Sequence, residues 1–490
     1  MTKRIPNWLV RRAFLTPERP AIVFNKTTIT FKELYAQTHE MGKKLTSIGI
    51  QKGDRVSVLM GNHLDMVILL HALQLIGCET VLLNIRLHPK ELQYQIEDSA
   101  AKFLITSEQF IDKVNYLQEK TDVSIWFIDE LKDQPGKDFT PVSEFLMDSV
   151  CTIMYTSGTT GFPKGVMHTY GNHWWSAIGS VLNLGLTEED SWLCALPLFH
   201  ISGFSILVKN VVYGMPIVLF EKFDEEKVNA VLQEGKATII SVVTNMLQRM
   251  VDQLGEGNYH PSFRCALLGG GPVPLALLEK CKEKCIPVFQ SYGLTETSSQ
   301  IVTLSPEDSL KKLGSAGKPL FPCEVKIMNE TRESGPNEIG EIVVKGPNVT
   351  KGYLNRKEEN ASCFTEDGWF YTGDVGYLDE EGYLYVIDRR SDLIISGGEN
   401  IYPAEIENVL MAHPAIKEAG VVGIPDQKWG EVPCAFYVVK EGADVTPEEL
   451  KQFCIEYLAK YKVPKKWVEV EKLPRNASNK LMRRKLREMI

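Results

Sequence analysis

Short apolar runs alternate with helical stretches through most of the first 290 residues, and this order constrains the fold more than any other feature. Residues 31–48 are predicted to form an amphipathic helix that begins at the capping-box pair Thr30 and Glu33, and residues 56–60 a buried strand. Further helices and strands are predicted in alternation over residues 65–76, 80–83, 92–99 and 102–106. Because strands that alternate with helices form parallel sheets covered by those helices, we expect a doubly wound α/β domain.

Polar turns that contain glycine follow two later strands of this series. The predicted strands of the second half are the apolar runs at residues 192–196, 217–220, 238–243, 265–268 and 288–290. The run at 265–268 leads directly into residues 269–272, and the run at 288–290 leads into a turn over residues 291–296. In doubly wound sheets, ligands bind just beyond the carboxyl ends of the strands. These two turns are therefore where we expect a nucleotide.

The last third of the chain has a different character. A length of 490 residues is too great for one core. From about residue 314 to 388, short β-like runs with frequent glycine and proline predict a small β-rich subdomain. A charged connector follows at residues 389–392, and beyond it we expect a separate, smaller α+β domain. Its predicted elements are helices over residues 403–411 and 447–460 and strands over residues 418–423 and 434–439.

Charge and composition narrow the partners. The chain has 54 basic and 63 acidic residues, a net charge of -9, which argues against a general role with nucleic acid. The most apolar window, residues 66–76, is too short to span a bilayer, and the N-terminus shows no signal peptide. Ten cysteines without a repeated spacing argue against zinc and favour a reducing cytoplasm. We expect small-molecule partners and no stable membrane insertion, and the sequence leaves a homo-oligomer open.

One loop, residues 155–165, predicts a phosphate site. It holds four small hydroxyl residues, three glycines and Lys164, so its backbone N–H groups can converge on an anion. It is not the P-loop of the NTPases, because Pro163 stands where that motif requires glycine and Gly165 replaces the hydroxyl that would bind magnesium. A Ser/Thr/Gly-rich solvent loop is the simpler alternative.

Residues 155–165 also resemble, nearly position for position, the signature loop of the adenylate-forming superfamily, which includes acyl-CoA synthetases, luciferases and peptide-synthetase adenylation domains. Similar motifs follow in the family's order at residues 269–272, 291–296, 369–374 and 473–480. The resemblance covers essentially the whole chain. It implies a large adenylation domain, residues 1–390, and a small mobile lid domain, residues 391–490, with ATP, Mg²⁺ and CoA as ligands.

The resemblance assigns roles around ATP. It places the loop residues against the pyrophosphate: Thr156, Ser157, Gly158, Thr159, Thr160 and Lys164. It builds an adenine slot from Gly269, Gly270, Gly271, Ser291 and Gly293, with Tyr292 stacked on the ring. Thr295 is implied to contact phosphate and Glu296 to bind magnesium, for which a single carboxylate beside phosphates is sufficient. Without the motif, Tyr292 would be an ordinary core aromatic and the Thr-Glu pair a helix cap.

The ribose and the reaction itself involve residues further along. Asp374 is implied to accept hydrogen bonds from both ribose hydroxyls, and Arg389 to contact the ribose or the α-phosphate. Lys480 is the predicted catalytic lysine, because adenylation brings a carboxylate against a phosphate and a buried ammonium between two anions offsets their repulsion. Two positions near it depart from the family's pattern, since Asn476 replaces threonine and Asn479 replaces glycine.

The family's second half-reaction requires the small domain to swing. Ser391 stands at the hinge position, where relatives usually carry Asp or Lys. After the swing, the paired glycines Gly397 and Gly398 are implied to leave room for the pantetheine arm of CoA. The basic side chains of Lys460, Lys462, Lys465 and Lys466 are interpreted as a solvated face, with contact to the CoA phosphates as the alternative.

Four stretches bear on the acid: residues 171–177, 197–205, 291–303 and 396–403. They resemble the branch of the family that activates an aromatic dicarboxylic acid at its succinyl carboxyl and leaves the ring carboxylate charged. His200 resembles the histidine that gates or orients the acid. Because a buried carboxylate needs polar partners, we expect them among Ser205, Thr244, Asn245, Ser299 and Gln300.

Two alternatives remain. The first is a ligase with the same mechanism for another acid, such as a coumarate-like, benzoate-like or fatty acid. The second is a non-catalytic module that binds a nucleotide or a partner and has kept the fold. The presence of Lys164, Glu296, Asp374 and Lys480 together argues against the second alternative.

Overall fold

The computed structural model describes residues 3–156, 162–270, 273–329, 332–388, 393–474 and 481–490. Two compact units divide the chain, a larger one of residues 1–85, 96–154 and 165–387 and a smaller one of residues 86–95, 155–164 and 388–490. The predicted boundary between residues 390 and 391 falls outside the described residues and stays a prediction. The sheets and helices of the two units confirm the predicted α/β fold class.

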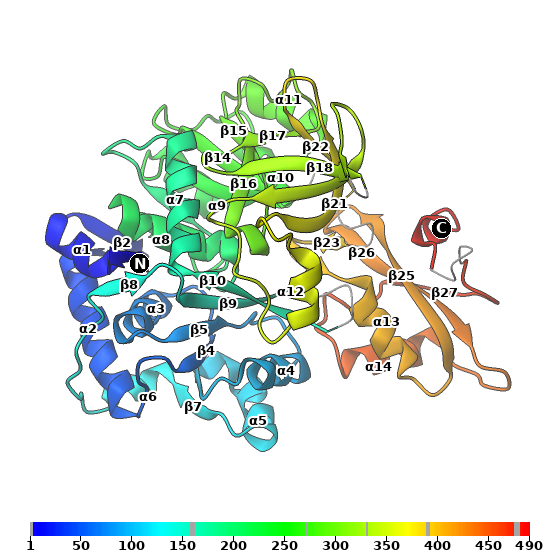
Figure 1. Cartoon of the computed structure of the whole chain (residues 1–490), viewed down its shortest axis with the longest axis horizontal. Helices are drawn as coiled ribbons and strands as arrows, with labels where there is room; N and C mark the ends of the chain where they lie inside the picture. Colours follow the sequence, from blue (N-terminus) through cyan, green and yellow to red (C-terminus); the bar gives the residue numbers. More distant parts are fainter. Residues whose placement is uncertain (1–2, 157–161, 271–272, 330–331, 389–392, 475–480) are drawn as a thin grey trace. The chain divides into compact units, whose positions relative to one another are not determined.

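Within the described residues, one sheet of the larger unit has six strands (Figure 1). In sheet order these are β10 (Lys164–Thr169), β9 (Val150–Thr156), β5 (Glu79–Leu82), β4 (Arg55–Leu59), β6 (Phe103–Thr106) and β7 (Ser124–Phe127). β4 pairs in parallel with β5 and β6, and β9 pairs in parallel with β5. The predicted β-α-β rhythm of the first part of the chain is thus confirmed.

Two helices that precede and follow β4 pack against one another beside this sheet (Figure 1). Helix α2 (Phe31–Ser47) begins with the predicted capping box, in which Thr30 and Glu33 satisfy each other's backbone N–H groups. Helix α3 (Leu64–Ile76) is buried on nearly every side and ends at Gly77, whose φ of 91° is left-handed. A helix that is apolar all round belongs in a core, which explains the short apolar window of the sequence.

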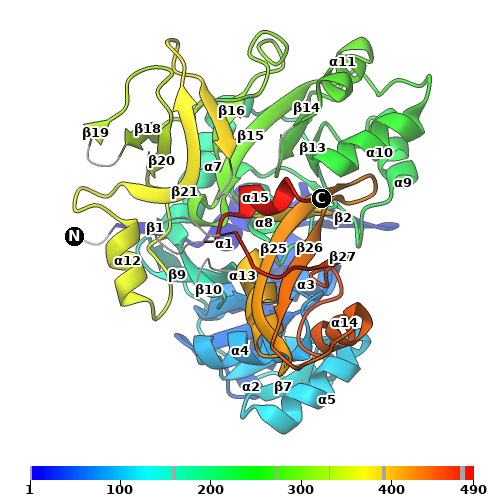
Figure 2. The same ribbon diagram turned by 90° about the vertical axis from the view of Figure 1, so that its right-hand side faces the viewer.

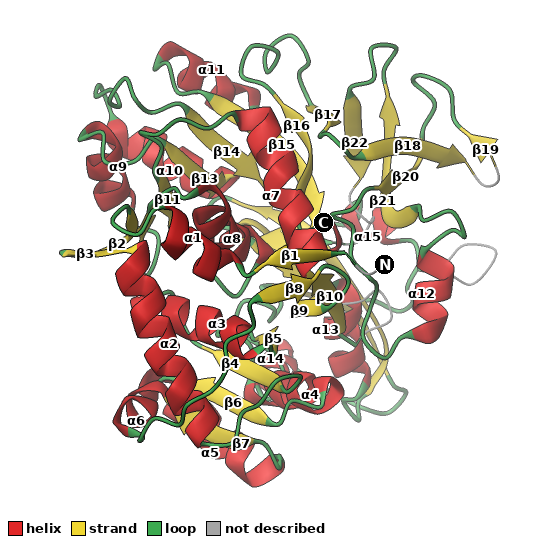
Figure 3. Ribbon diagram, turned by 60° about the vertical axis from the view of Figure 1, so that its left-hand side comes forward, coloured by secondary structure: helices red, strands yellow, loops and turns green. Residues whose placement is uncertain are grey.

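A second, long sheet carries most of the predicted nucleotide site. Its strands are, in order, β19 (Arg332–Glu333), β18 (Glu324–Asn329), β20 (Gly340–Lys345), β21 (Phe370–Leu378), β22 (Leu384–Asp388), β17 (Ser315–Pro319), β16 (Ser299–Leu304), β15 (Val288–Leu294), β14 (Cys265–Gly269), β13 (Ile239–Val243), β11 (Trp192–Cys194), β12 (Ile217–Leu219), β2 (Pro20–Phe24) and β3 (Thr27–Thr30). Strands β11 to β15 are parallel, and the strands from β16 to β22 form antiparallel pairs. Helices α7 (Tyr170–Leu184) and α8 (Ile201–Tyr213) pack together and against β16 (Figure 3).

Strand β15 differs from its prediction. We expected it to end at Gln290 and to open into a turn, but it continues to Leu294. The reason is its antiparallel partner β16, which extends the pairing to Leu294 opposite Ser299. The register shifts between Tyr292 and Gly293, so residues 291–294 of the predicted turn form a bulged strand.

The smaller unit contains a five-stranded sheet among its described residues. Its long hairpin of β25 (Ile416–Asp426) and β26 (Gly430–Val439) is prominent in Figure 2. Strand β26 also pairs with β23 (Ile394–Ser396) and β27 (Lys466–Glu469), and β23 pairs in turn with β24 (Glu399–Ile401). Helix α13 (Pro403–Met411) packs on β25 and on α14 (Pro447–Ile455). The predicted helix over 403–411 is confirmed, whereas the one over 447–460 ends five residues early.

Seven of the ten cysteines are buried, and all ten are free thiols. Among the described residues, no helix combines the length and the apolar character that a membrane crossing needs.

Candidate functional site

The structure describes the flanks of the predicted phosphate loop. Strand β9 ends at Thr156 and strand β10 begins at Lys164, whose side chain is buried. Several predicted site residues lie outside the described residues: Ser157, Gly158, Thr159, Thr160, Gly271, Arg389, Ser391 and Lys480. Their roles stay predictions.

The predicted magnesium ligand Glu296 lies in a short 3-10 turn, η2 (Thr295–Thr297), that follows β15. Its carboxylate is buried, and Oε1 accepts a hydrogen bond from the Tyr353 hydroxyl over 2.8 Å. The Glu296 carbonyl accepts a second one from the Thr350 N–H over 2.7 Å. Side chain and backbone of Glu296 are therefore held by two residues that lie more than 50 positions further along the chain.

This arrangement suits magnesium. The described residues contain no group of three His, Cys, Asp or Glu side chains that would hold a metal by themselves. Mg²⁺ is commonly held by one or two carboxylates together with phosphate oxygens and water. A single oriented carboxylate at Glu296 fits that requirement when the phosphates of ATP supply the remaining ligands.

Backbone strain follows directly after the turn. Ser298 has a φ of 54° and Ser299 a φ of 108°, both in the region that favours glycine. Such conformations cost free energy and persist where surrounding contacts hold them, often at functional sites. Here the Ser298 carbonyl accepts a hydrogen bond from the Ser176 hydroxyl over 2.6 Å.

Two residues of the predicted nucleotide site contact each other. The Tyr292 hydroxyl donates to Oδ2 of Asp374 over 2.7 Å, and both side chains are buried. A carboxylate oxygen has two lone pairs, so this bond is compatible with the predicted ribose contacts of Asp374. Tyr292 belongs to a buried cluster with Val302 and Phe370, and its stacking on adenine stays a prediction.

The glycines of the predicted adenine slot have little space for side chains. A Cβ on Gly293 would lie 2.1 Å from the Ser299 carbonyl oxygen, and one on Gly269 would lie 3.2 Å from Ser291 Oγ. Gly270 has a φ of 91°. The Ser291 hydroxyl donates to the Leu268 carbonyl over 3.0 Å. Glycine is therefore explained at Gly293 by the close approach of the β15 and β16 backbones, and at Gly270 by its left-handed conformation.

A buried chain of hydrogen bonds behind the turn was not predicted from the sequence. Nε2 of His168 in β10 lies 2.7 Å from the Thr295 carbonyl oxygen, and its Nδ1 lies 3.3 Å from Thr152 Oγ1. That same hydroxyl lies 2.9 Å from Nε2 of His173 in α7. All three side chains are buried. No spacing pattern in the sequence connects residues 152, 168 and 295.

The predicted acid-pocket residues are only partly brought together. Ser205 on α8 has its hydroxyl 3.5 Å from that of Ser299 on β16, at the limit of a hydrogen bond. Gln300 is buried and donates to Thr303 Oγ1 over 3.1 Å. His200 precedes α8 as its N-cap residue, half-buried. Two further candidates, Thr244 and Asn245, begin helix α10 (Thr244–Leu254).

A buried cation on α8 was missed. Lys209 is 1% exposed, and its Nζ lies 4.6 Å from the centroid of the Trp192 ring. Burial lowers the pKa of Lys209 to about 8, and no carboxylate of the described residues opposes this effect. Residues four apart lie on the same face of a helix, so Lys209 is one turn along the face that carries Ser205. Lys209 lies in an apolar run of the sequence, and such a run is typical of a core helix. The pattern therefore did not indicate a functional role.

In the smaller unit, the predicted glycines form the turn of the β23–β24 hairpin. Gly397 and Gly398 have φ values of 58° and 86°, and the Gly397 N–H donates to the Trp429 carbonyl over 2.8 Å. A Cβ on Gly397 would lie 2.7 Å from the Trp429 ring. Glycine is therefore required here for the turn itself, and a role with CoA stays a prediction.

Lys462 corrects our interpretation of a solvated basic face. Its side chain is buried, and Nζ lies 2.6 Å from Oε1 of Glu91 and 2.8 Å from Oε2 of Glu405. The buried carboxylate of Glu405 and the half-buried carboxylate of Glu91 neutralise it and raise its pKa. A lysine with these partners contributes no net positive charge to a phosphate site, whereas Lys460, Lys465 and Lys466 are exposed as expected.

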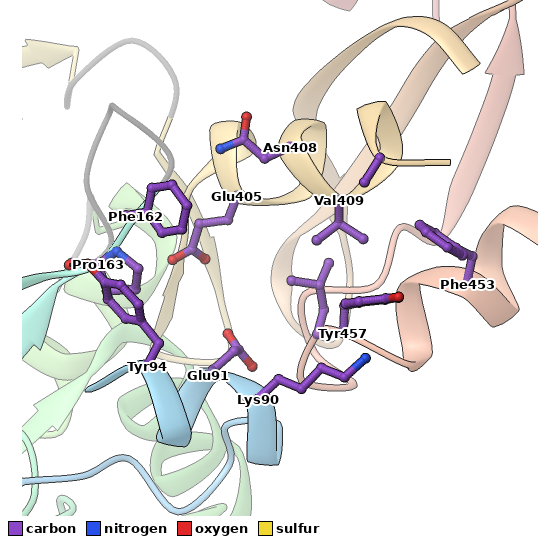
Figure 4. Close-up of a pocket in the computed structure, with 12 residues that line it drawn as sticks. Lys90, Glu91, Tyr94, Phe162, Pro163, Glu405, Asn408, Val409, Phe453 and Tyr457 are labelled. Carbon is purple, nitrogen blue, oxygen red and sulfur yellow. Dashed lines mark hydrogen bonds between the residues drawn. The ribbon is translucent and has the colours of Figure 1, made fainter. Parts of the chain in front are cut away.

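Close to these charges, the smaller unit has a cavity of about 260 Å³ (Figure 4). Tyr94 and Phe162 line one part of it, with ring centroids 5.5 Å apart. In another part, Nζ of Lys90 lies 3.5 Å from the centroid of the Tyr457 ring. None of the predicted site residues lines this cavity.

Comparison with known proteins gives two family matches. The AMP-binding enzyme family matches residues 9–354, and the AMP-binding enzyme C-terminal domain matches residues 405–480. Among curated proteins, 2-succinylbenzoate–CoA ligase of Geobacillus sp. (strain WCH70) is 53% identical over 100% of this chain and 98% of its own length. The ligase of the same name from Bacillus cereus (strain ATCC 14579) is also 53% identical, over 100% of this chain and 99% of its own.

Solved structures of o-succinylbenzoate CoA synthetase from Bacillus subtilis are also similar. A double mutant bound to its product analogue is 52% identical, covers 99% of each chain and has a TM-score of 0.95. The complex with the acyl-adenylate intermediate is 51% identical, covers 99% of this chain and 98% of its own, and has a TM-score of 0.78. The complex with ATP and magnesium ion also has a TM-score of 0.78 and is 51% identical. That match covers 99% of this chain and 100% of the B. subtilis chain.

Proposed function

The chain belongs to the AMP-binding enzyme family, and on this premise we propose that it is an ATP-dependent ligase that joins 2-succinylbenzoate to CoA in menaquinone biosynthesis. A carboxylate oxygen of the acid attacks the α-phosphorus of ATP, which forms the acyl-adenylate and releases pyrophosphate. The thiol of CoA then attacks the acyl carbon, which forms the thioester and releases AMP and a proton. Identity of 53% to a 2-succinylbenzoate–CoA ligase over the whole of this chain carries this proposal.

The first half-reaction needs charge to be neutralised at the phosphates. The loop of residues 155–165 and Lys164 bind the pyrophosphate portion, and the Glu296 carboxylate is oriented by Tyr353 to hold magnesium. Mg²⁺ supplies positive charge for the phosphate oxygens. Asp374 and the glycines beside Ser291 hold the nucleoside. Support comes from the buried, hydrogen-bonded placement of Glu296 and Asp374 in one unit.

Lys480 neutralises the developing charge between the acid and the α-phosphate. Replacing it tests the proposed function most directly. We expect Lys480→Ala to lower acid-dependent ATP–pyrophosphate exchange by at least about a hundredfold, because catalysis loses a charge placed for the transition state. The same variant should still convert preformed acyl-adenylate and CoA to the thioester. If exchange persists unchanged, Lys480 has no part in adenylation.

The ring carboxylate of the substrate needs a buried cation, and we propose Lys209 for that role. An isolated charge is costly to bury, and two opposite charges that meet in an apolar pocket relieve the cost for each other. Lys209 is a buried ammonium on the same helix face as Ser205. The hydroxyl of Ser205 in turn lies 3.5 Å from that of Ser299. The hydroxyls of Ser205 and Ser299 and the amide of Gln300 complete the proposed subsite, with His200 at its entrance.

We also propose that the smaller unit moves between the two half-reactions, with Ser391 as the hinge. Two B. subtilis complexes support this proposal, one with a product analogue and one with the acyl-adenylate. Both matches cover 99% of this chain, but their TM-scores are 0.95 and 0.78, so the two complexes differ in structure from one another. Ser391→Pro, which fixes φ at the hinge, should retain pyrophosphate exchange and lower thioester formation about tenfold or more. Equal loss of both half-reactions would assign the hinge elsewhere.

A ligase for another acid is the competing function. Thioester formation that depends on ATP and CoA, measured with 2-succinylbenzoate, benzoate and a long-chain fatty acid, separates the two. We expect kcat/KM for 2-succinylbenzoate to exceed the others by at least about a hundredfold, since a site built for a buried charge rejects ligands without it.

A cytoplasmic location is part of the proposal, supported by ten free thiols.

A further inference from the structure

His168 has a defined hydrogen-bonding state that follows from its partners. The Thr295 carbonyl oxygen can only accept, so Nε2 of His168, 2.7 Å away, carries the proton. Burial lowers the pKa of His168 to about 4, which leaves the ring neutral and makes Nδ1 an acceptor. Nδ1 therefore accepts from the Thr152 hydroxyl, which lies 3.3 Å away.

The same logic extends to His173. Because the Thr152 proton is used towards His168, its oxygen accepts from Nε2–H of His173 over 2.9 Å. Burial also lowers the pKa of His173 well below its ordinary value, so this ring is neutral too. One direction of donation thus runs from α7 through β9 and β10 to Thr295. Each member sets the proton position of the next.

The last acceptor in this series of hydrogen bonds lies in the turn that would meet ATP and magnesium. The Thr295 carbonyl accepts from His168, and the Glu296 carbonyl accepts from the Thr350 N–H. Two strained residues with positive φ, Ser298 and Ser299, follow this turn directly. A turn beside strained backbone keeps its geometry only when its contacts over-determine it.

We propose that His168 is a positioning residue for this turn: its Nε2–H holds the Thr295 carbonyl, and with it the directions in which the Thr295 hydroxyl and the Glu296 carboxylate leave the backbone. The inference rests on the proposed function, because the turn acts only if MgATP binds there. It predicts that loss of the Nε2 donor weakens the response to magnesium before it affects the acid.

The test compares His168→Gln with His168→Asn. The glutamine amide nitrogen lies near the position of Nε2 and can still donate to Thr295, whereas the asparagine amide is one methylene shorter and cannot. ATP–pyrophosphate exchange is measured against Mg²⁺ concentration at saturating 2-succinylbenzoate. We expect the half-saturating Mg²⁺ concentration to rise about tenfold in His168→Asn and to stay within about twofold in His168→Gln. KM for the acid should change in neither variant.

His71→Asn is the matched control. His71 is a buried histidine of α3, and burial lowers its pKa to about 4 as well. The control should lower thermal stability without moving the half-saturating Mg²⁺ concentration. If the wild type is active and the half-saturating Mg²⁺ concentration of His168→Asn does not change, the inference is overturned while the proposed function stands. An equal rise of this concentration in His71→Asn has the same consequence. Absence of exchange in the wild type overturns the proposed function and the inference together.

A second pair of variants applies if His168→Asn does not fold. Thr152→Val removes the hydroxyl that sets the His168 tautomer, and Thr152→Ser retains it. We expect a rise in half-saturating Mg²⁺ of about threefold in the first and none in the second. NMR of protein labelled with ¹⁵N-histidine gives a direct measurement of the tautomer. The ring signals that disappear in His168→Gln belong to His168, and in the wild type they should show the Nε2–H tautomer. An Nδ1–H tautomer contradicts the inference.

Discussion

The hydroxyl of Tyr353 donates a hydrogen bond to Oε1 of Glu296 over 2.8 Å, and both side chains are buried. The two lie 57 positions apart in the sequence. A buried carboxylate with a defined donor has a defined direction, which a metal ligand needs. The pair therefore connects the fold to the proposed chemistry at one atom.

Tyr353→Phe tests this pair. Loss of a hydrogen bond to a charged group costs about 1.5–3 kcal/mol, so we expect the half-saturating Mg²⁺ concentration in pyrophosphate exchange to rise at least about tenfold. Tyr383→Phe is the control, since it removes a hydroxyl that donates to Asp308 over 3.1 Å, apart from the proposed site. Equal behaviour of the two variants would show that Tyr353 does not orient the proposed metal ligand.

Lys209→Met tests the proposed partner of the ring carboxylate. We expect kcat/KM for 2-succinylbenzoate to fall at least about tenfold, because the substrate charge would be buried without its cation. The matched substrate is 4-phenyl-4-oxobutanoate, which lacks only the ring carboxylate and should be used no worse by the variant than by the wild type. Lys209→Arg should recover part of the activity. A similar loss with both substrates would mean that Lys209 only supports the core.

Gly293→Ala tests the close approach of strands β15 and β16. The new Cβ would lie 2.1 Å from the Ser299 carbonyl oxygen, which is backbone and can move only with its strand. Overpacking of this kind costs about 1–3 kcal/mol, and we expect lower thermal stability together with a higher KM for ATP. Gly61→Ala is the control, because its Cβ would lie 3.7 Å from the nearest atom. Denaturation curves and ATP titrations of both variants decide the matter.

His71 predicts acid sensitivity of the fold. Burial lowers its pKa to about 4 from the model-peptide value of 6.5, so the unfolded chain binds more protons between these pH values. Stability from this residue is present above about pH 6.5 and is lost as pH falls towards 4, by about 2 kcal/mol between pH 7 and pH 5. His71→Leu should show a correspondingly shallower decline of unfolding free energy with acid. A parallel decline in both proteins would contradict a neutral, buried His71.

Local patterns were sufficient for much of this molecule. The capping box at Thr30, the end of α3 at Gly77 and the helix that begins at Pro403 all follow from residues within a few positions of one another. Strand β15 shows where such patterns stop being informative, because its last four residues owe their conformation to pairing with β16. Lys462 shows the same for charge, since its two carboxylate partners are far away in sequence.

The amino-acid sequence by itself determined the α/β class, because helix and strand periodicity is a property of neighbouring residues. It also predicts a phosphate loop at residues 155–165 from the chemistry of a glycine-rich turn. Only the tertiary structure decided that Tyr353 meets Glu296, that His168 reaches the Thr295 carbonyl, and that Lys209 is a buried cation. The physical reason is that these contacts depend on strand order, register and exclusion of water. Each of those arises from many distant residues packed together, and no spacing along the chain encodes it.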